Sequence, residues 1–312
     1  MSQNCSTQVS RKRRTPVVRN FVASVLHQLD DRQEYTRQVF LELCERTSLV
    51  DLAGKDRSWA IIGGAVRDTL LSPKIGCSHL FELWPDIDIA VTHDVSELPV
   101  AAGSSNDRSI TISPNSFGGL KIREPKLGVI DFWTWTTPKN HGSTANWLEE
   151  LERVDFGMNA VAFVWPQREV IIHRRWIQDL RTRRIEKVSP QSPKTSIQVV
   201  RAIALKVKLQ LLVNQSFGLG TNIRQDLQWL VKDAPRAEVT QAIHYMIEKT
   251  TNSRWPIATL ERFLRVSRAY RQSVEFDEAI LEVWGDRFSR SIPRKPKNKL
   301  QGRTSHQTTL DL

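Results

Sequence analysis

The sequence predicts a mixed β-sheet flanked by helices, followed by an all-α helical domain. Three observations lead to this fold class. Short β-rich runs alternate with turns and short helical pieces from about residue 58 to residue 188. Apolar residues recur at helical spacing after Pro193. The 312 residues are 40% hydrophobic and 25% charged, which is typical of a globular protein with a substantial core.

The sequence divides into four regions. Residues 1–16 are polar, contain the basic run 11–14, and are expected to form a flexible arm. Residues 17–188 are expected to form the α/β domain, which begins with two helices that are separated near Asp30 and Asp31. Residues 189–289 are expected to form the helical domain, and residues 290–312 a disordered basic tail that contains almost no apolar side chains.

Strands and helices within these regions follow from local pattern. We expect strands at Trp59–Ile62, Ile87–Val91, Gly119–Ile122, Val129–Trp135, Val161–Val164 and Val170–Ile172. We expect helices of the second domain at Ile197–Leu212, Ile223–Val231, Val239–Ile247, Leu260–Ala269 and Phe276–Val283.

The charge balance indicates the class of partner. The chain has 45 Lys and Arg against 34 Asp and Glu, a net charge of +11, which favours polyanions, nucleic acid first and acidic membrane surfaces second. The three cysteines lack zinc-site spacing and point to a reducing compartment. With no apolar run long enough to cross a bilayer and no secretory signal, we expect a cytoplasmic protein without a membrane partner.

A glycine pair, Gly63 and Gly64, lies between an apolar strand and a helix that carries Val66 and Leu70. Two glycines at such a junction permit a tight turn and leave backbone N–H groups at a helix N-terminus, where a phosphate binds well. The pair is either a phosphate cradle or an ordinary turn.

Three aspartates are candidates for a metal site. Asp86 and Asp88 share one face of their strand, because side chains two residues apart point the same way. Asp131 lies inside an apolar strand, where an ionised carboxylate is expensive unless it is paired or bound to metal. If the two strands are neighbours, the three acids form one Mg²⁺ site. The alternatives are a solvated edge strand for the pair, and for Asp131 a contact with water or a Lys.

The order of these motifs resembles the nucleotidyltransferase superfamily of the polymerase β type. Residues 63–68, Gly-Gly-Ala-Val-Arg-Asp, together with residues 86–89, Asp-Ile-Asp-Ile, are similar to the head domain of the class II CCA-adding enzyme and bacterial poly(A) polymerase family. Residues 153–160 and 177–180 are similar to two later motifs of that head. The resemblance covers residues 58–215 and implies a nucleotidyltransferase head followed by a helical neck.

The resemblance also implies roles for individual residues. Asp86, Asp88 and Asp131 would hold two catalytic Mg²⁺ ions. A second set would bind the nucleoside triphosphate or support the loop around it: Gly63, Gly64, Arg67, Asp68, Arg153, Asp155, Asn159 and Arg201.

The sequence departs from the family at several motifs. Val154 replaces an arginine, Gly157-Met158 replaces Thr-Ile, and Thr136 stands where an arginine is expected. The segment Lys194–Gln198 lacks the family's base-reading Glu-Asp pair, so that Arg201 is the surviving neck arginine. Ordered CCA addition by the family's usual protein template is therefore not expected.

These observations favour a Mg²⁺-dependent, template-independent transfer of a nucleoside monophosphate from an NTP, ATP first, to an RNA 3′ end, tRNA first, with release of pyrophosphate. One alternative is a toxin or defence enzyme that modifies a protein or small-molecule hydroxyl. Another is an RNA- or nucleotide-binding relative without activity.

Overall fold

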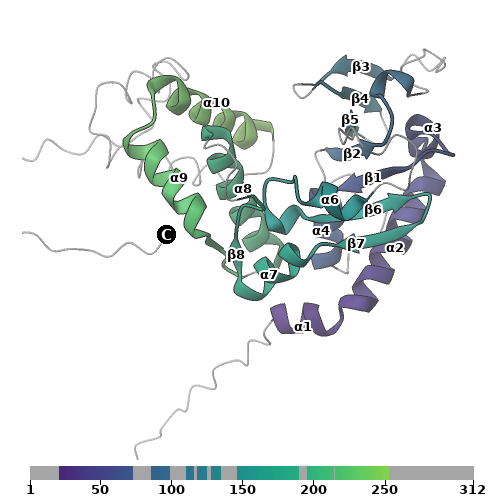
Figure 1. The fold of residues 1–312 in the computed structure, drawn as a ribbon, viewed down its shortest axis with the longest axis horizontal. Coiled ribbons are helices and arrows are strands. Elements are labelled where there is room, and N and C mark those ends of the chain that lie inside the picture. Colours follow the sequence, from purple (N-terminus) through teal and green to yellow (C-terminus); the bar gives the residue numbers. More distant parts are fainter. Residues whose placement is uncertain are drawn as a thin grey trace, which may run out of the picture.

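A computed structural model describes residues 21–72, 86–98, 110–115, 118–124, 128–134, 146–189, 195–213 and 215–252. In Figure 1 a sheet with helices on both faces lies to the right, and a group of three long helices lies to the left. This arrangement confirms the predicted fold class. No helix in the described ranges is both long enough and apolar enough to cross a membrane.

The sheet has seven strands in the order β3-β4-β5-β2-β1-β6-β7. Neighbouring strands run antiparallel except β2 and β5, which are parallel. Because β2 and β5 are parallel, both strands begin at the same end of the sheet. The strands are β1 (Trp59–Ile62), β2 (Ile87–Val91), β3 (Thr111–Pro114), β4 (Leu120–Glu124), β5 (Gly128–Thr134), β6 (Val161–Trp165) and β7 (Glu169–Ile172).

The two faces of the sheet bury different side chains, because residues alternate along each strand. One face carries bulky residues such as Ile61 and Ile89, which belong to the same core as the apolar residues of α2 (Leu29–Arg46) and α4 (Gly64–Leu71). The other face carries small residues such as Ala60 and Ala90, and α6 (Trp147–Leu151) packs there. Asp88 lies two residues before Ala90 and therefore belongs to the second face.

The smaller elements complete the α/β part. α7 contacts both η2 and α1, and the short strands β8 and β9 pair in parallel beyond α7. These elements are α1 (Phe21–His27), α3 (Leu49–Ala53), η1 (Val95–Glu97), η2 (Gly157–Asn159), α7 (Arg174–Thr182), β8 (Arg184–Ile185) and β9 (Gly218–Leu219).

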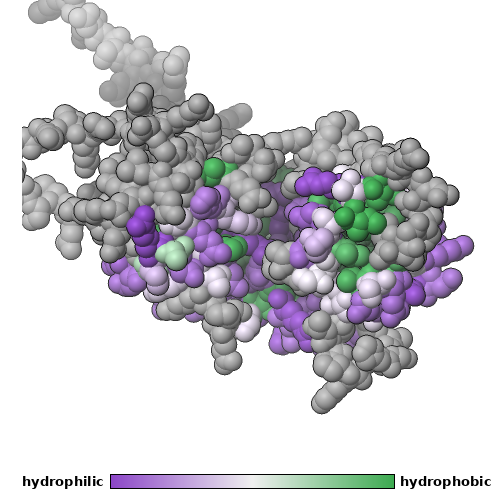
Figure 2. Space-filling view, turned by 90° about the horizontal axis from the view of Figure 1, so that it is seen from above, coloured by the Kyte–Doolittle hydropathy of each residue, from purple (hydrophilic) through white to green (hydrophobic). Residues whose placement is uncertain are grey.

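The helical part consists of α8 (Ser196–Val213), α9 (Thr221–Lys232) and α10 (Arg236–Asn252) in the described residues. α8 belongs to two cores: its residues Ala202 and Leu205 join the core of the sheet, whereas Val199 and Val200 join a second core with α9 and α10. Seen from above, hydrophobic residues gather over the strand-bearing part, and hydrophilic residues predominate toward the helices (Figure 2).

Several predicted elements differ from the observed ones. The break between the first two helices lies at Gln28. Asp30 and Asp31 lie in the first turn of α2, where carboxylates are stabilised by the positive end of the helix. The helices α3, α6, α7, η1 and η2 and the strands β3, β8 and β9 were not predicted as individual elements. Trp135, the helices expected at 260–269 and 276–283, the arm and the tail lie outside the described residues. The division at residue 188 stays a prediction.

Candidate active site

Asp88 connects the two motifs that the sequence analysis singled out. In the parallel pairing of β2 and β5 its register partner is Asp131. In the antiparallel pairing of β1 and β2 its partner is Ile62, the residue directly before Gly63. Strand pairing therefore places one acid between a second acid and the glycine pair. The two acid-bearing strands are neighbours, which was the condition for a joint site of the three acids.

The alternation along β2 agrees with the sequence pattern. Ile87 and Ile89 are buried in the core, whereas Asp86 and Asp88 are half-buried. Asp86 directly precedes the first residue of the strand. Asp88 shares its face of the sheet with Asp131, its register partner. That Asp86, one residue before the strand, lies on the same face stays a prediction.

Asp131 has a cationic neighbour that the sequence did not identify. Lys121, its register partner on β4, places Nζ 3.5 Å from Oδ2 of Asp131. The other carboxylate oxygen, Oδ1, is buried and has no hydrogen-bond partner among the described residues. A contact with a Lys was one of the alternatives for Asp131, and it applies to one of the two oxygens.

The carboxylates provide the oxygen ligands that Mg²⁺ prefers, and the unsatisfied Oδ1 of Asp131 fits such an ion. In the described part of the chain, no group of three or more His, Cys, Asp and Glu side chains lies close enough to hold a metal. A Mg²⁺ site formed by Asp86, Asp88 and Asp131 therefore stays a prediction.

The glycine pair forms a tight turn between β1 and α4. Gly63 precedes the helix and has φ of 78° and ψ of −117°, a backbone conformation that requires glycine. Its N–H donates to the carbonyl of Val161 at 2.9 Å, which ties the turn to β6. Gly64 begins α4, whose first turn has N–H groups without intrahelical acceptors. This geometry fits both the phosphate cradle and the ordinary turn.

Arg67 and Asp68 form a buried network behind this turn. Arg67 is 3% exposed and Asp68 is 2% exposed. Nη2 of Arg67 lies 2.6 Å from Oδ1 of Asp68, and its Nη1 donates a hydrogen bond to Oδ1 of Asn159. Asn159 in turn lies beside Gly63, whose added Cβ would be 3.7 Å from Asn159 Cβ. The network therefore connects α4, η2 and the glycine turn.

Arg153 and Asp155 each have a partner of opposite charge. Nη1 of Arg153 lies 3.8 Å from Oε2 of Glu150, a carboxyl whose pKa is raised by burial. Oδ2 of Asp155 lies 2.7 Å from Nη1 of Arg201 on α8. The two residues that the resemblance implies at the sugar and phosphates are thus held by α6 and by the first turns of α8.

Asp179 on α7 is a buried acid that the sequence analysis did not single out as a site residue. Burial raises its pKa to about 7, although a hydrogen bond from the backbone of Glu186 opposes this shift. Its carboxylate lies against Gly157: a Cβ on Gly157 would be 2.7 Å from Oδ2 of Asp179. A side chain at position 157 would therefore force one of the two elements to shift.

The segment aligned with the family's base-reading motif packs against α10 where it is described. The N–H of Ser196 donates to Oε2 of Glu238 at 3.1 Å, and its Oγ hydrogen-bonds with Oε1 of Gln241 at 3.2 Å. Thr195 caps the start of α8, with its Oγ1 3.2 Å from the N–H of Gln198. Lys194 and Thr136 lie outside the described residues.

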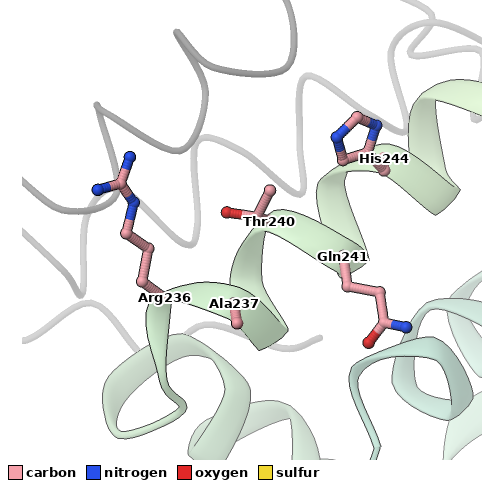
Figure 3. A pocket seen from close by; sticks show the side chains of 5 residues that line it. All are labelled: Arg236, Ala237, Thr240, Gln241 and His244. Atoms are coloured by element: carbon pink, nitrogen blue, oxygen red, sulfur yellow. The ribbon is translucent and has the colours of Figure 1, made fainter.

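A large open cavity lies elsewhere, along α10. It has a volume of about 770 Å³ and is lined by Arg236, Ala237, Thr240, Gln241 and His244. Arg236, Thr240 and His244 project from one side of the helix in Figure 3. No aspartate or glycine of the candidate site lines this cavity.

No family model and no curated protein matches this sequence. Solved structures are similar in fold. A tRNA nucleotidyltransferase complexed with a primer tRNA and an incoming ATP analog is 24% identical, with a TM-score of 0.46 over 71% of this chain and 59% of that chain. A tRNA-processing enzyme with CTP is 22% identical, with a TM-score of 0.47 over 73% and 55%. The Thermotoga maritima CCA-adding enzyme complexed with tRNA is 18% identical, with a TM-score of 0.47 over 72% and 51%. This chain spans between half and three fifths of their lengths.

Proposed function

We propose that this protein is a nucleotidyltransferase that transfers a nucleoside monophosphate from an NTP to the 3′ hydroxyl of an RNA. The acceptor oxygen forms a bond to the α-phosphorus, and the bond from that phosphorus to pyrophosphate breaks. The observation that carries the proposal is the register of β2, which aligns Asp88 with Asp131 on one side and with Ile62, beside the glycine pair, on the other.

The candidate site has groups suited to each part of this reaction. Gly63 and Gly64 place the first turn of α4 next to the acids, and N–H groups at a helix N-terminus bind phosphate. Two Mg²⁺ ions held by Asp86, Asp88 and Asp131 would lower the pKa of the acceptor hydroxyl and stabilise the leaving pyrophosphate. Positioning and charge account for most of the acceleration of such a reaction, so no Ser, His or Cys nucleophile is required.

Side chains behind the glycine turn keep it in place. Arg67 bonds to Asn159, and Asn159 packs against Gly63, so that a bound triphosphate would not need to reorganise this loop. Preorganised groups are effective because they require no rearrangement as charge develops.

An RNA acceptor is favoured by the net charge of +11 and by the motifs shared with enzymes that extend RNA 3′ ends. ATP is the favoured donor and tRNA the favoured acceptor, as the motif resemblance implies. The sequence departs from the family at Val154 and at residues 194–198, where the family contacts the sugar and the base of the nucleotide. The identity of the donor base is therefore tested by supplying each NTP separately.

The test is incorporation of label from each α-³²P-labelled NTP, supplied separately, into total RNA and into purified tRNA. We expect wild-type protein to label RNA in the presence of Mg²⁺. We expect Asp86→Asn/Asp88→Asn to reduce this activity by at least about 100-fold, because the loss of one electrostatic contact to a transition state has an effect of this order on the rate. The matched control is Asp56→Asn, because Asp56 is an exposed acid in a turn outside the site. Undiminished labelling by the double variant, or no labelling by wild type, would contradict the proposal.

A second candidate function keeps the chemistry and changes the acceptor to a protein or small-molecule hydroxyl. It is favoured by the contacts of Ser196 with α10. These contacts hold against α10 the segment that is aligned with the family's base-reading motif. The same reactions separate the two functions: label in a protein band or in a small molecule, with none in RNA, would favour the second. Binding of NTP and RNA without any incorporation would favour an inactive relative.

A further inference from the structure

Five arginines lie close together on α7 and β8: Arg174, Arg175, Arg181, Arg183 and Arg184. Four of them are exposed, and Arg175 is half-buried. None of the five forms an ion pair with another described residue. The acid within this stretch, Asp179, is buried and points toward Gly157. We call the five residues the α7 arginine surface.

Helix stability does not explain this arrangement. Arg174 and Arg175 occupy the first turn of α7, which contains no acidic residue. The N-terminal end of a helix carries partial positive charge, so that cations there are unfavourable. Arg183 ends the helix with φ of 51°, a left-handed conformation that favours glycine or asparagine. The charges of Arg174 and Arg175 are therefore locally unfavourable, and a ligand of opposite charge would offset this cost.

The shape of the surface suits a chain of phosphates. A shallow hollow of about 330 Å³ follows one face of α7, with Arg174 and Arg181 two turns apart. Ile177, Gln178 and Thr182 complete its lining, and Gln178 lies between the two arginines along the helix. Guanidinium groups bind phosphate oxygens in a bidentate manner and keep their charge at all physiological pH values.

We propose that the α7 arginine surface binds the phosphate backbone of the RNA acceptor. The inference rests on the proposed function for the identity of the polyanion. α7 packs against η2, whose Asn159 belongs to the network behind the glycine turn. The helix that carries the surface is therefore anchored to the segment that supports the candidate active site. Contacts of its exposed face with RNA are to phosphates and carry no sequence information.

The test measures affinity of the full-length protein for fluorescein-labelled tRNA by anisotropy at several KCl concentrations, without NTP or Mg²⁺. The variant is Arg174→Gln/Arg181→Gln. The matched control, Arg46→Gln/Arg57→Gln, removes the same net charge from arginines that pair with Glu42 and Glu97. Thermal unfolding verifies that both variants fold.

We expect the slope of log affinity against log salt to become less steep by about 1.5 in the α7 variant, because each lost phosphate contact removes 0.7 to 0.9. The control slope stays within experimental error of wild type. In the transfer assay, the KM for tRNA rises and the KM for NTP does not change. An α7 variant with the wild-type salt slope overturns the proposal.

Two further outcomes separate this inference from the proposed function. Loss of tRNA binding in the α7 variant, in a protein that incorporates no nucleotide, supports the surface and contradicts only the transfer reaction. Unchanged tRNA binding in the α7 variant together with lost binding to phosphatidylserine-containing vesicles overturns the RNA proposal in favour of an anionic membrane.

Discussion

Nζ of Lys208 lies 2.6 Å from Oδ2 of Asp68, and this contact joins the helical part to the candidate active site. Asp68 is almost completely buried and bonds through its other oxygen to Arg67. Arg67 reaches Asn159, which packs against Gly63. Arg201, seven residues before Lys208 and thus on the same side of α8, bonds to Asp155. α8 therefore balances two acids that the resemblance implies at the nucleotide site.

Lys208→Met is expected to destabilise the protein by about 1–3 kcal/mol, because a buried carboxylate oxygen loses its partner. The loss is not larger because the lysine side chain is 37% exposed and water screens part of the interaction. Urea unfolding of Lys208→Met, Asp68→Asn and the double variant measures the coupling between the two residues. Lys208→Arg, which keeps the charge, is expected to recover part of the loss. A coupling energy of zero in this cycle would contradict a stabilising contact.

Some residues of the candidate site could be predicted from the sequence, because local patterns along the chain mark them. Asp86 and Asp88 follow from alternation on one strand, and Gly63 from the junction of a strand and a helix. Lys121 and Lys208 could not be predicted, because their contacts with Asp131 and Asp68 depend on strand register and on the docking of a distant helix. No local pattern encodes these two quantities.

The unpredicted elements have a similar explanation. β3 is the exception, because residues 109–113, Ser-Ile-Thr-Ile-Ser, alternate polar and apolar side chains and could have indicated a strand. β8 and β9 consist of two residues each and form only through their mutual pairing. α3 is five residues long, which is shorter than one and a half helical turns.

The pKa of Asp179 predicts a pH dependence of stability. Burial raises this pKa from 3.8 to about 7 in the folded protein. The folded state therefore binds the proton more tightly than the unfolded state, and stability decreases as the pH rises from about 4 to about 7. Above the folded pKa the loss reaches a plateau, on the order of 4 kcal/mol. Urea unfolding between pH 4 and pH 8.5 measures this profile.

Asp179→Asn is the matched variant for that profile, because an amide of the same size accepts a backbone hydrogen bond and does not titrate. We expect the variant to lose less stability than wild type over the same pH interval and to differ from it most above pH 7. Parallel profiles for the two proteins would show that another group causes the pH dependence.

The close approach of Gly157 and Asp179 predicts the effect of adding one methyl group. Gly157→Ala places a Cβ 2.7 Å from Oδ2 of Asp179 and 2.8 Å from its Cγ, so that one of the two elements must shift. We expect a destabilisation of about 1–3 kcal/mol, as for other overpacked sites. Removing the carboxylate in Gly157→Ala/Asp179→Ala is expected to relieve the clash. The double variant should therefore be more stable than the sum of the single effects, and simple additivity in thermal unfolding would contradict this account.

Among the described residues, Lys187 and Asp226 form the most deeply buried ion pair between the α/β part and the helical part. Their side chains are 3% and 6% exposed, and Nζ lies 2.5 Å from Oδ2. Lys187→Met leaves a buried carboxylate on α9 without its partner, and we expect a loss of about 3–5 kcal/mol. Replacing both residues, as Lys187→Met/Asp226→Leu, removes both desolvation penalties, and most of that stability should return. Urea unfolding of the single and double variants decides the point. If the double variant is as unstable as Lys187→Met, the geometry of the pair is required in addition to its charge balance, and the attachment of α9 to the segment after β8 depends on it.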